Sequence, residues 1–235
     1  MLILAIDSST PVAGVAIVDK EKIWAESFLN TGYTHSELLM PMIENTFKKI
    51  KLKPQEIDAI AVSRGPGSFT GLRIGMVTGK SLAQVLGKKL TSVPTLDLLA
   101  FNLWGQEGII CPILNARKNE VYTALYEMQG QELVRLSEYM AISPLALAEK
   151  LKTMEKETRF LGDGVPVYKE ILQKELDSQA RWVPLTHLLP RASSLGLLGL
   201  KQLEKGQEDD IYTLEPLYIR KSEAEVRWEE NACRI

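Results

Sequence analysis

Residues 63–75 read SRGPGSFTGLRIG, and this stretch decides how the first half of the chain is organised. It follows the apolar run Ile57–Val62, which is typical of a buried strand, and it precedes a helical pattern over Thr70–Leu86. Its glycines suit a turn that either presents backbone N–H groups to an anion or lets another backbone come close. A phosphate cradle and a packing contact are therefore the two hypotheses for this turn.

The glycines continue into the helix at a four-residue interval. Gly71, Gly75, Gly79 and Ala83 fall on one face of that helix and leave the face almost free of side chains. Because glycine costs up to ~1 kcal/mol relative to alanine inside a helix, such a stripe requires a compensating close contact. The contact is either with this protein's own sheet or first helix, or with another subunit, and we expect the subunit.

The pattern does not support a P-loop. No Gly-Lys-Ser/Thr follows Gly65–Phe69 at the required spacing, and Lys80 lies well inside the helix. Arg64 and Arg73 flank the glycines and suit either phosphate binding or ion pairs across an interface.

Bulk composition is that of an ordinary globular protein: 235 residues, 45% hydrophobic and 25% charged. The net charge of −2 does not favour strong nucleic-acid binding through overall electrostatic attraction. Cys111 and Cys233 are the only cysteines, so a disulfide framework is not expected. The first residues do not form a signal segment, and no apolar run approaches the ~18 residues of a membrane span. We expect a cytoplasmic protein without a membrane anchor.

Both halves of the chain predict the element order βββαβαβα. In the first half the expected strands are Leu2–Ile6, Val12–Val18, Ile23–Leu29, Ile57–Val62 and Leu90–Val93, with helices over 35–50, Thr70–Leu86 and Thr95–Trp104. In the second half they are Ile109–Leu114, Val121–Glu127, Leu133–Ile142, Arg159–Leu161 and Arg181–Val183, with helices over 144–154, Val165–Leu176 and Ala192–Glu204.

This duplicated α/β unit resembles the actin/sugar-kinase/Hsp70 (ASKHA) superfamily, in which two lobes face each other across a nucleotide cleft. The resemblance implies a first, interaction lobe at 1–105 and a second lobe at 106–212. We expect residues 213–235 to form a tail that returns to the first lobe.

The same resemblance implies two weak nucleotide-binding segments, one after the first strand and one in the second lobe. The candidate residues are Asp7, Ser8, Ser9, Thr10, Gly162, Asp163 and Gly164. The first segment would approach the phosphates, and its Asp would organise Mg²⁺. A residue with a side chain, Ser8, stands where the superfamily usually has Gly, which restricts close approach of phosphate. Two plain polar turns are the alternative, and no cofactor is predicted.

No catalytic or metal-binding constellation is evident. His35 and His187 are the only histidines and are not spaced as a His-x-x-x-His metal pair. Gly-x-Ser-x-Gly is absent, and the carboxylates are spread along the chain without a pair on one face. The sequence therefore predicts no catalytic residue and no metal ion.

Several motifs together resemble the bacterial TsaB (YeaZ) family over most of the chain. They are Ile6-Asp7-Ser8-Ser9, Thr34-His35-Ser36-Glu37, the Gly65–Gly75 motif, Ala116-Arg117 followed by Glu120-Val121-Tyr122, and Pro216-Leu217-Tyr218-Ile219-Arg220. One departure is Asn115, which stands where the family pattern has Asp before Ala-Arg.

The resemblance implies a paralogue of the TsaD-type transferase that has lost its active site. Its implied role is to bind and support that transferase, with a TsaE-type ATPase as third partner. The complex transfers a threonylcarbamoyl group to N6 of adenosine 37 in tRNAs that read ANN codons, and this chain would meet tRNA only indirectly. A homodimer through the same helices is a further possibility.

The implied pairing surface uses the helices at about 35–50 and 70–86. The candidate interface residues are His35, Leu38, Leu39, Met42, Ile43, Phe69, Gly71, Arg73, Gly75, Met76, Gly79 and Ala83. Two other functions compete with this one. A stand-alone ASKHA-type ATPase or phosphotransferase would bind ATP in the cleft, and a glycoprotein endopeptidase would need the metal-binding His pair that the chain lacks.

Overall fold

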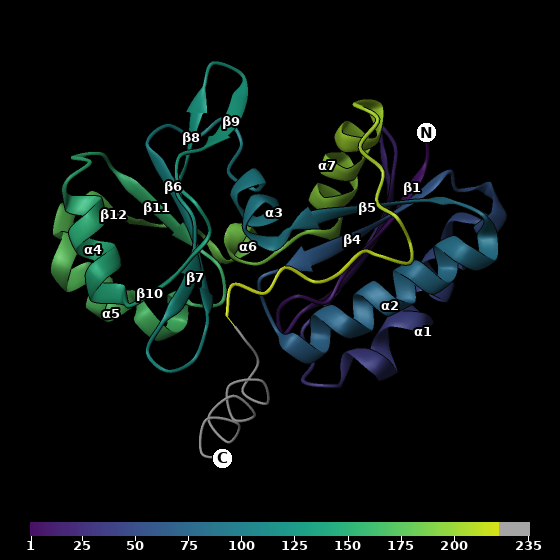
Figure 1. The fold of residues 1–235 in the computed structure, drawn as a ribbon, viewed down its shortest axis with the longest axis horizontal. Helices are drawn as coiled ribbons and strands as arrows, with labels where there is room; N and C mark the ends of the chain where they lie inside the picture. The colour runs from purple at the N-terminus through teal and green to yellow at the C-terminus, as the bar shows by residue number, and fades with distance from the viewer. Residues whose placement is uncertain (221–235) are drawn as a thin grey trace, which may run out of the picture.

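The computed structural model describes residues 1–220, which form two β-sheets and three layers of helices (Figure 1). The first half contains β1 (Ile3–Asp7), β2 (Ala13–Val18), β3 (Ile23–Leu29), α1 (His35–Ile50), β4 (Ala59–Gly65), α2 (Phe69–Leu86), β5 (Lys89–Pro94) and α3 (Thr95–Phe101). The second half contains β6 (Ile109–Asn115), β7 (Val121–Thr123), β8 (Tyr126–Gln129), β9 (Glu132–Arg135), β10 (Met140–Ile142), α4 (Pro144–Lys152), β11 (Thr158–Leu161), α5 (Val165–Leu176), β12 (Ala180–Trp182), α6 (Leu185–Leu188) and α7 (Ala192–Glu204). Short 3-10 turns lie at Pro54–Glu56 and Asp177–Gln179.

The first sheet has the strand order β3-β2-β1-β4-β5. Its centre is mixed, because β1 pairs antiparallel with β2 and parallel with β4. The apolar runs of β1 and β2 are buried along their whole length, as expected for strands covered on both faces. The second sheet repeats this plan, with β6 antiparallel to β7 and parallel to β11.

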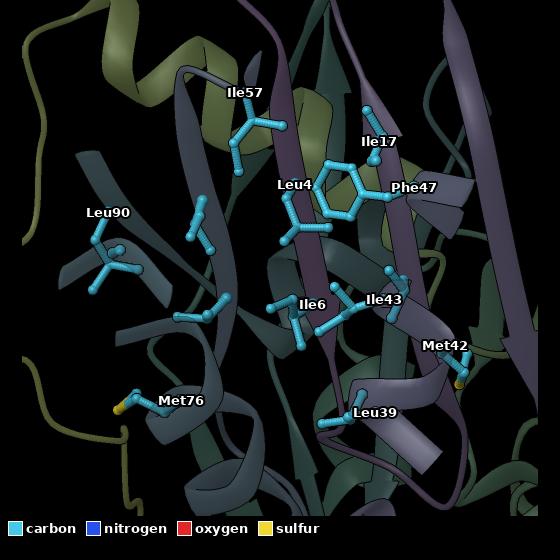
Figure 2. Packing of buried hydrophobic residues seen from close by; sticks show 14 of the residues in the cluster. Leu4, Ile6, Ile17, Leu39, Met42, Ile43, Phe47, Ile57, Met76 and Leu90 are labelled. Carbon is cyan, nitrogen blue, oxygen red and sulfur yellow. The ribbon is translucent and has the colours of Figure 1, made fainter. Parts of the chain in front are cut away.

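Helices α1 and α2 cover one face of the first sheet and form the outer layer of that lobe (Figure 1). Figure 2 shows the core beneath them, where Phe47 and Ile43 of α1 lie beside Leu4 and Ile6 of β1. Leu39 of α1 and Met76 of α2 belong to the same cluster. These α1 and α2 side chains are almost completely buried. The apolar face of the helix pair is therefore used by the protein's own sheet.

The closing helix of each half packs against the sheet of the other half. Helix α7 places Leu195 and Leu200 on the first sheet, on the side opposite α1 and α2. Helix α3 places Leu96 and Leu99 against strands of the second sheet. The two helices form a shared middle layer (Figure 1). A boundary at 105/106 therefore separates the two repeats in sequence, but it does not separate two independently packed units.

Four short strands stand where the second half was expected to have two long ones. The range Val121–Glu127 divides into β7 and β8, because the chain leaves the ladder at Ala124-Leu125. The range Leu133–Ile142 divides likewise into β9 and β10. The inserted β8–β9 hairpin joins the sheet at one position, where Tyr126 pairs with Ile110. This hairpin has no counterpart in the first half.

The chain after α7 runs back along the first lobe. The backbone carbonyl of Leu214 accepts a hydrogen bond from Lys80 of α2, and Leu217 N–H donates to the carbonyl of Arg64 at 2.8 Å. Residues 221–235, with Cys233, lie outside the described part of the chain. Within residues 1–220, Cys111 is a buried free thiol, and no helix is long and apolar enough to cross a membrane.

We expect unfolding to be a single cooperative event, because α3 and α7 each pack against the sheet of the other half. Replacing Leu195 or Leu96 by Ala removes a fully buried side chain and should cost about 2–5 kcal/mol of unfolding free energy. Leu145→Ala on the exposed side of α4 is the control and should cost under about 0.5 kcal/mol. Urea unfolding followed by fluorescence and circular dichroism measures the unfolding free energy and shows whether there is one transition. Two separate transitions in any variant would show that the lobes unfold independently.

Candidate functional site

The glycine-rich turn connects β4 to α2 and is bounded by two specialised positions. Gly65 ends β4 with a φ of +109°, and a side chain there would meet the backbone carbonyl of Leu217 in the returning tail. Ser68 caps α2, with its Oγ accepting a hydrogen bond from Gly71 N–H at 3.2 Å. The turn is thus shaped by contacts within the chain.

The glycine stripe of α2 faces the protein's own first sheet. A Cβ on Gly71 would collide with the backbone carbonyl oxygen of Ser8, and one on Gly75 would collide with Ser8 Oγ. A Cβ on Gly79 would collide with Val62 of β4. The expectation that these glycines and Ala83 meet another subunit is therefore corrected, since all four are buried against β1, β4 and the turn after β1.

The turn at Asp7–Thr10 is sealed beneath α2 and the glycine-rich loop. All four of its residues are at most 1% exposed. Ser68 N–H donates to the Ser9 carbonyl at 2.7 Å, and Ser8 Oγ donates to the Gly71 carbonyl at 2.8 Å. A phosphate cannot reach these backbone groups in this arrangement. The geometry therefore agrees with the alternative to phosphate binding, a plain polar turn whose groups hydrogen-bond to neighbouring backbone.

Asp7 is a fully buried carboxylate with one satisfied oxygen. Its Oδ1 accepts from Ser9 N–H at 3.1 Å and from Ser9 Oγ at 2.7 Å, whereas Oδ2 has no partner within the described chain. Burial raises the pKa of Asp7, although the hydrogen bonds from Ser9 and the nearby His35 oppose the increase. His35 lies over the same turn, with Nε2 at 2.8 Å from the Thr10 carbonyl oxygen.

The other nucleotide candidates also have structural roles. Gly162 has a φ of +104° and, like Gly164, leaves no room for a side chain beside the backbone of Ile113. Asp163 Oδ1 accepts a hydrogen bond from Asn115 N–H at 3.0 Å, and burial raises the pKa of this carboxyl group. These three residues join the ends of β6 and β11. No group of three or more His, Cys, Asp or Glu side chains in residues 1–220 is placed to hold a metal ion.

The predicted interface residues divide into two classes. Eight of them are buried in the core or under the glycine stripe, and their side chains are not available to a partner: Leu39, Met42, Ile43, Gly71, Gly75, Met76, Gly79 and Ala83. His35 and Leu38 are half-buried, and Phe69 and Arg73 are exposed. Pairing through this helix layer stays a prediction, with a different set of contacting residues.

Sequence reasoning missed the exposed apolar residues of the layer. Met40 of α1 is 50% exposed, Val77 of α2 is 61% exposed and Val85 is 83% exposed. Together with Phe69 they form what we call the outer ridge. The signal was present in the spacing, because the positions 69, 73, 77, 81 and 85 are also four residues apart. Once the glycines face inward, these positions face outward.

The tail adds an aromatic side chain to the ridge. Tyr218 stacks on Phe69 with ring centroids 5.0 Å apart, and its hydroxyl lies 3.0 Å from Arg73 Nε, which donates to it. The guanidinium of Arg73 also lies 3.9 Å from the centre of the Phe69 ring. Arg64 Nε donates to the Glu215 carbonyl in the same segment. Both arginines that flank the glycines therefore bind the tail.

Comparison with known proteins identifies the family to which the chain belongs. A family model described as "TsaD: tRNA N6-adenosine threonylcarbamoyltransferase" matches residues 30–228. The tRNA threonylcarbamoyladenosine biosynthesis protein TsaB of Bacillus subtilis is 32% identical over 231 residues, which covers 98% of this chain and 99% of that protein. The chain belongs to the TsaB family. The predicted family resemblance is thereby confirmed.

Solved structures agree with this assignment. A Pseudomonas aeruginosa structure, described as an uncharacterized protein with similarity to peptidase YEAZ, superposes with a TM-score of 0.79 at 25% identity. The superposition covers 93% of this chain and 99% of that one. A ROK hexokinase from Thermus thermophilus has a TM-score of 0.51 at 10% identity over 88% of this chain and all of that one, and it shows the fold alone. The predicted ASKHA fold is therefore confirmed for this TsaB-family chain.

We expect Gly75→Ala to destabilise the isolated chain, because the added Cβ meets Ser8 Oγ. The cost should be about 1–3 kcal/mol in urea unfolding. Ser8→Ala should lose ~1 kcal/mol with its hydrogen bond, yet the double variant should cost less than the sum, since Ser8 Cβ is 3.5 Å from the added atom. Ser81→Ala on the exposed side of α2 is the control. Additive costs would contradict the proposed contact.

A pH series should reveal the buried carboxyl group of Asp7. Its folded-state pKa is raised above the ordinary 3.8, so the folded state retains a proton that the unfolded state has lost. Stability should therefore fall as the pH rises from about 4 through the folded-state pKa, and then level off. Asp7→Asn keeps the Oδ1 acceptor but cannot titrate, so its urea midpoint should not show this fall. Parallel curves for the two proteins would contradict the assignment.

Proposed function

We propose that the chain is a non-catalytic subunit that binds and supports a TsaD-type transferase. The complex would transfer a threonylcarbamoyl group to N6 of adenosine 37 in tRNAs reading ANN codons. The observation that carries the proposal is the outer ridge on α1 and α2, which is apolar, exposed and supported from beneath by a completely packed core. Family membership supplies the partner class, since the matching relative is named for threonylcarbamoyladenosine biosynthesis.

The ridge has the features of a helix-to-helix interface. Its apolar members stand on two neighbouring helices that form the outer layer of the first lobe (Figure 1). Half-buried Leu38, Ile74 and Leu82 lie between the exposed residues and the core, so the layer is rigid where a partner would dock. Phe69, Arg73 and Tyr218 form an aromatic and cationic group at one end. Aromatic residues and arginine are typical of interface hot spots.

The sealed turn supports a non-catalytic role. An ASKHA ATPase must bring phosphates to the turn after its first strand, and here that turn is buried under α2. This burial argues against the stand-alone ATPase or phosphotransferase. An endopeptidase of the metal-dependent class would need a ligand cluster, and the described residues contain none. We therefore assign the chemistry to the partner and the nucleotide hydrolysis to a TsaE-type ATPase.

The remaining parts of the proposal follow from this role. A subunit that acts on tRNA through its partner would work in the cytoplasm and would touch tRNA only indirectly. In the absence of the transferase, two copies of this chain could cover the ridge as a symmetric homodimer. The transferase and the second copy would then compete for the same residues.

A matched pair of substitutions tests the ridge. Val77→Glu places a charge in the proposed interface and should weaken the complex with the TsaD-type protein by at least about tenfold, because a buried unpaired charge is costly. Val167→Glu on α5 is the control, since Val167 is also a half-exposed helical valine but lies on the other lobe. Size-exclusion chromatography with light scattering measures both complexes.

The same proteins test the role. The chain alone should form no threonylcarbamoyladenosine, whereas addition of the TsaD-type and TsaE-type proteins should restore synthesis, and Val77→Glu should reduce it. Equal complex formation by a well-folded Val77→Glu variant would overturn the interface. Turnover of ATP by the isolated chain would overturn the non-catalytic role.

A further inference from the structure

A cavity of about 380 Å³ lies on the side of the molecule away from α1 and α2. Its walls come from the shared middle layer, α3 and α7, and from the β8–β9 hairpin of the second lobe. In Figure 1 the β8–β9 hairpin and α7 lie on either side of α3, whereas α1 and α2, which carry the outer ridge, cover the other face of the first sheet. The volume is in the range of small-molecule sites, and the role of the ridge does not account for it.

A carboxylate stands in the wall of this cavity with one oxygen free. Asp97 Oδ1 accepts hydrogen bonds from the hydroxyls of Tyr126, at 2.6 Å, and Tyr139, at 2.8 Å. Both of these hydrogen bonds are made to Oδ1, and within residues 1–220 Oδ2 accepts none, so Oδ2 is left for a donor on a ligand in the cavity. Burial raises the pKa of Asp97, and the positive charge of Arg135 opposes this increase. The two tyrosines fix the carboxylate in place.

Aromatic side chains form much of the rest of the cavity lining. Trp104 is 53% exposed although it is the largest type of side chain, and Phe101 of α3 lies in the same lining. The ring of Tyr139 is already covered on one side by the Arg135 guanidinium, at 4.0 Å from the ring centre. Exposed aromatic faces around a cavity suit a planar ring system.

Positive charge lies at the rim. Arg135 and Lys201 line the cavity, and both are exposed. A second, shallower hollow shares Asp97 and Lys201 with the first and extends along α7 to Lys205. With Asp97 as the single acidic group in the two linings, the combined site carries a net positive charge. A ligand that matches all three features is planar, donates a hydrogen bond and is anionic.

We propose that this cavity, which we call the hairpin pocket, binds a nucleotide. The base lies against Trp104 and donates a hydrogen bond to Asp97 Oδ2, and the phosphate binds Lys201 and Arg135. Amino and ring N–H groups of nucleobases supply the donor, and Lys and Arg are the usual partners of phosphate. The nucleotide is either free in solution or part of a single-stranded RNA, because both present the same base and phosphate.

Calorimetry of the isolated full-length chain tests the proposal. The titrants are AMP, GMP, CMP and UMP, with the corresponding nucleosides and inorganic phosphate as partial ligands. At least one mononucleotide, or a single-stranded RNA of about six nucleotides, should bind with a Kd below about 1 mM, and the partial ligands should bind more weakly. Comparable affinity for mononucleotide and RNA identifies the free nucleotide, whereas binding of RNA alone identifies the RNA.

Two matched pairs of variants assign the binding to the hairpin pocket. Trp104→Ala and Lys201→Glu should each weaken binding by at least about tenfold, because they remove a stacking surface and a phosphate partner. Trp24→Ala and Lys174→Glu are the controls, at an exposed tryptophan and a lysine on other elements, and they should leave the affinity unchanged. Circular dichroism checks that each variant is folded.

Two results would overturn the proposal. One is the absence of saturable binding by all four mononucleotides and by RNA. The other is binding that Trp104→Ala and Lys201→Glu leave at the parent affinity. Neither result bears on the outer ridge, because the pairing experiment uses substitutions on a different face of the protein.

Discussion

The backbone of α2 lies directly against β4 and the turn after β1, and much of the first lobe depends on this contact. Glycine at 71, 75 and 79 removes the side chains that would separate the helix from the sheet. The approach buries the Asp7–Thr10 turn and leaves no opening for phosphate. It also fixes the rotation of α2, so that Val77 and Val85 face outward. A single packing contact thus buries the turn after β1 and sets which side chains of α2 are exposed.

The exchange of α3 and α7 extends this rigidity to the second lobe. Each helix buries leucines against the sheet of the other half, so the inner face of each sheet is covered only when both repeats are present. The tail adds a further connection, because it follows α2 and reaches the second lobe through the ion pair of Arg220 with Glu120. The two lobes are therefore held in one orientation. This suits a subunit that offers a fixed surface to a partner.

The sequence predicted the element order, the duplicated halves and the family, since strongly periodic segments and the residues 63–75 determine them. It also predicted that the glycine stripe needs a close contact. It could not decide whether the stripe contacts the protein's own sheet or another subunit. The spacing shows which residues share a face of the helix, but not what that face packs against. The break between β7 and β8, the stacking of Tyr218 on Phe69 and the hairpin pocket were not predictable for the same reason. Each depends on residues that are far apart in the chain.

The position of α7 has a consequence for synthesis on the ribosome. One face of the β1–β2 hairpin is complete in sequence by Val18, but the helix that covers it begins at Ala192. More than half of the chain must emerge before that apolar surface can be buried, and contacts of such long range form slowly. A nascent chain that carries only the first repeat is therefore a natural client for chaperones. Truncated forms that end before α7 should aggregate rather than accumulate as a folded lobe.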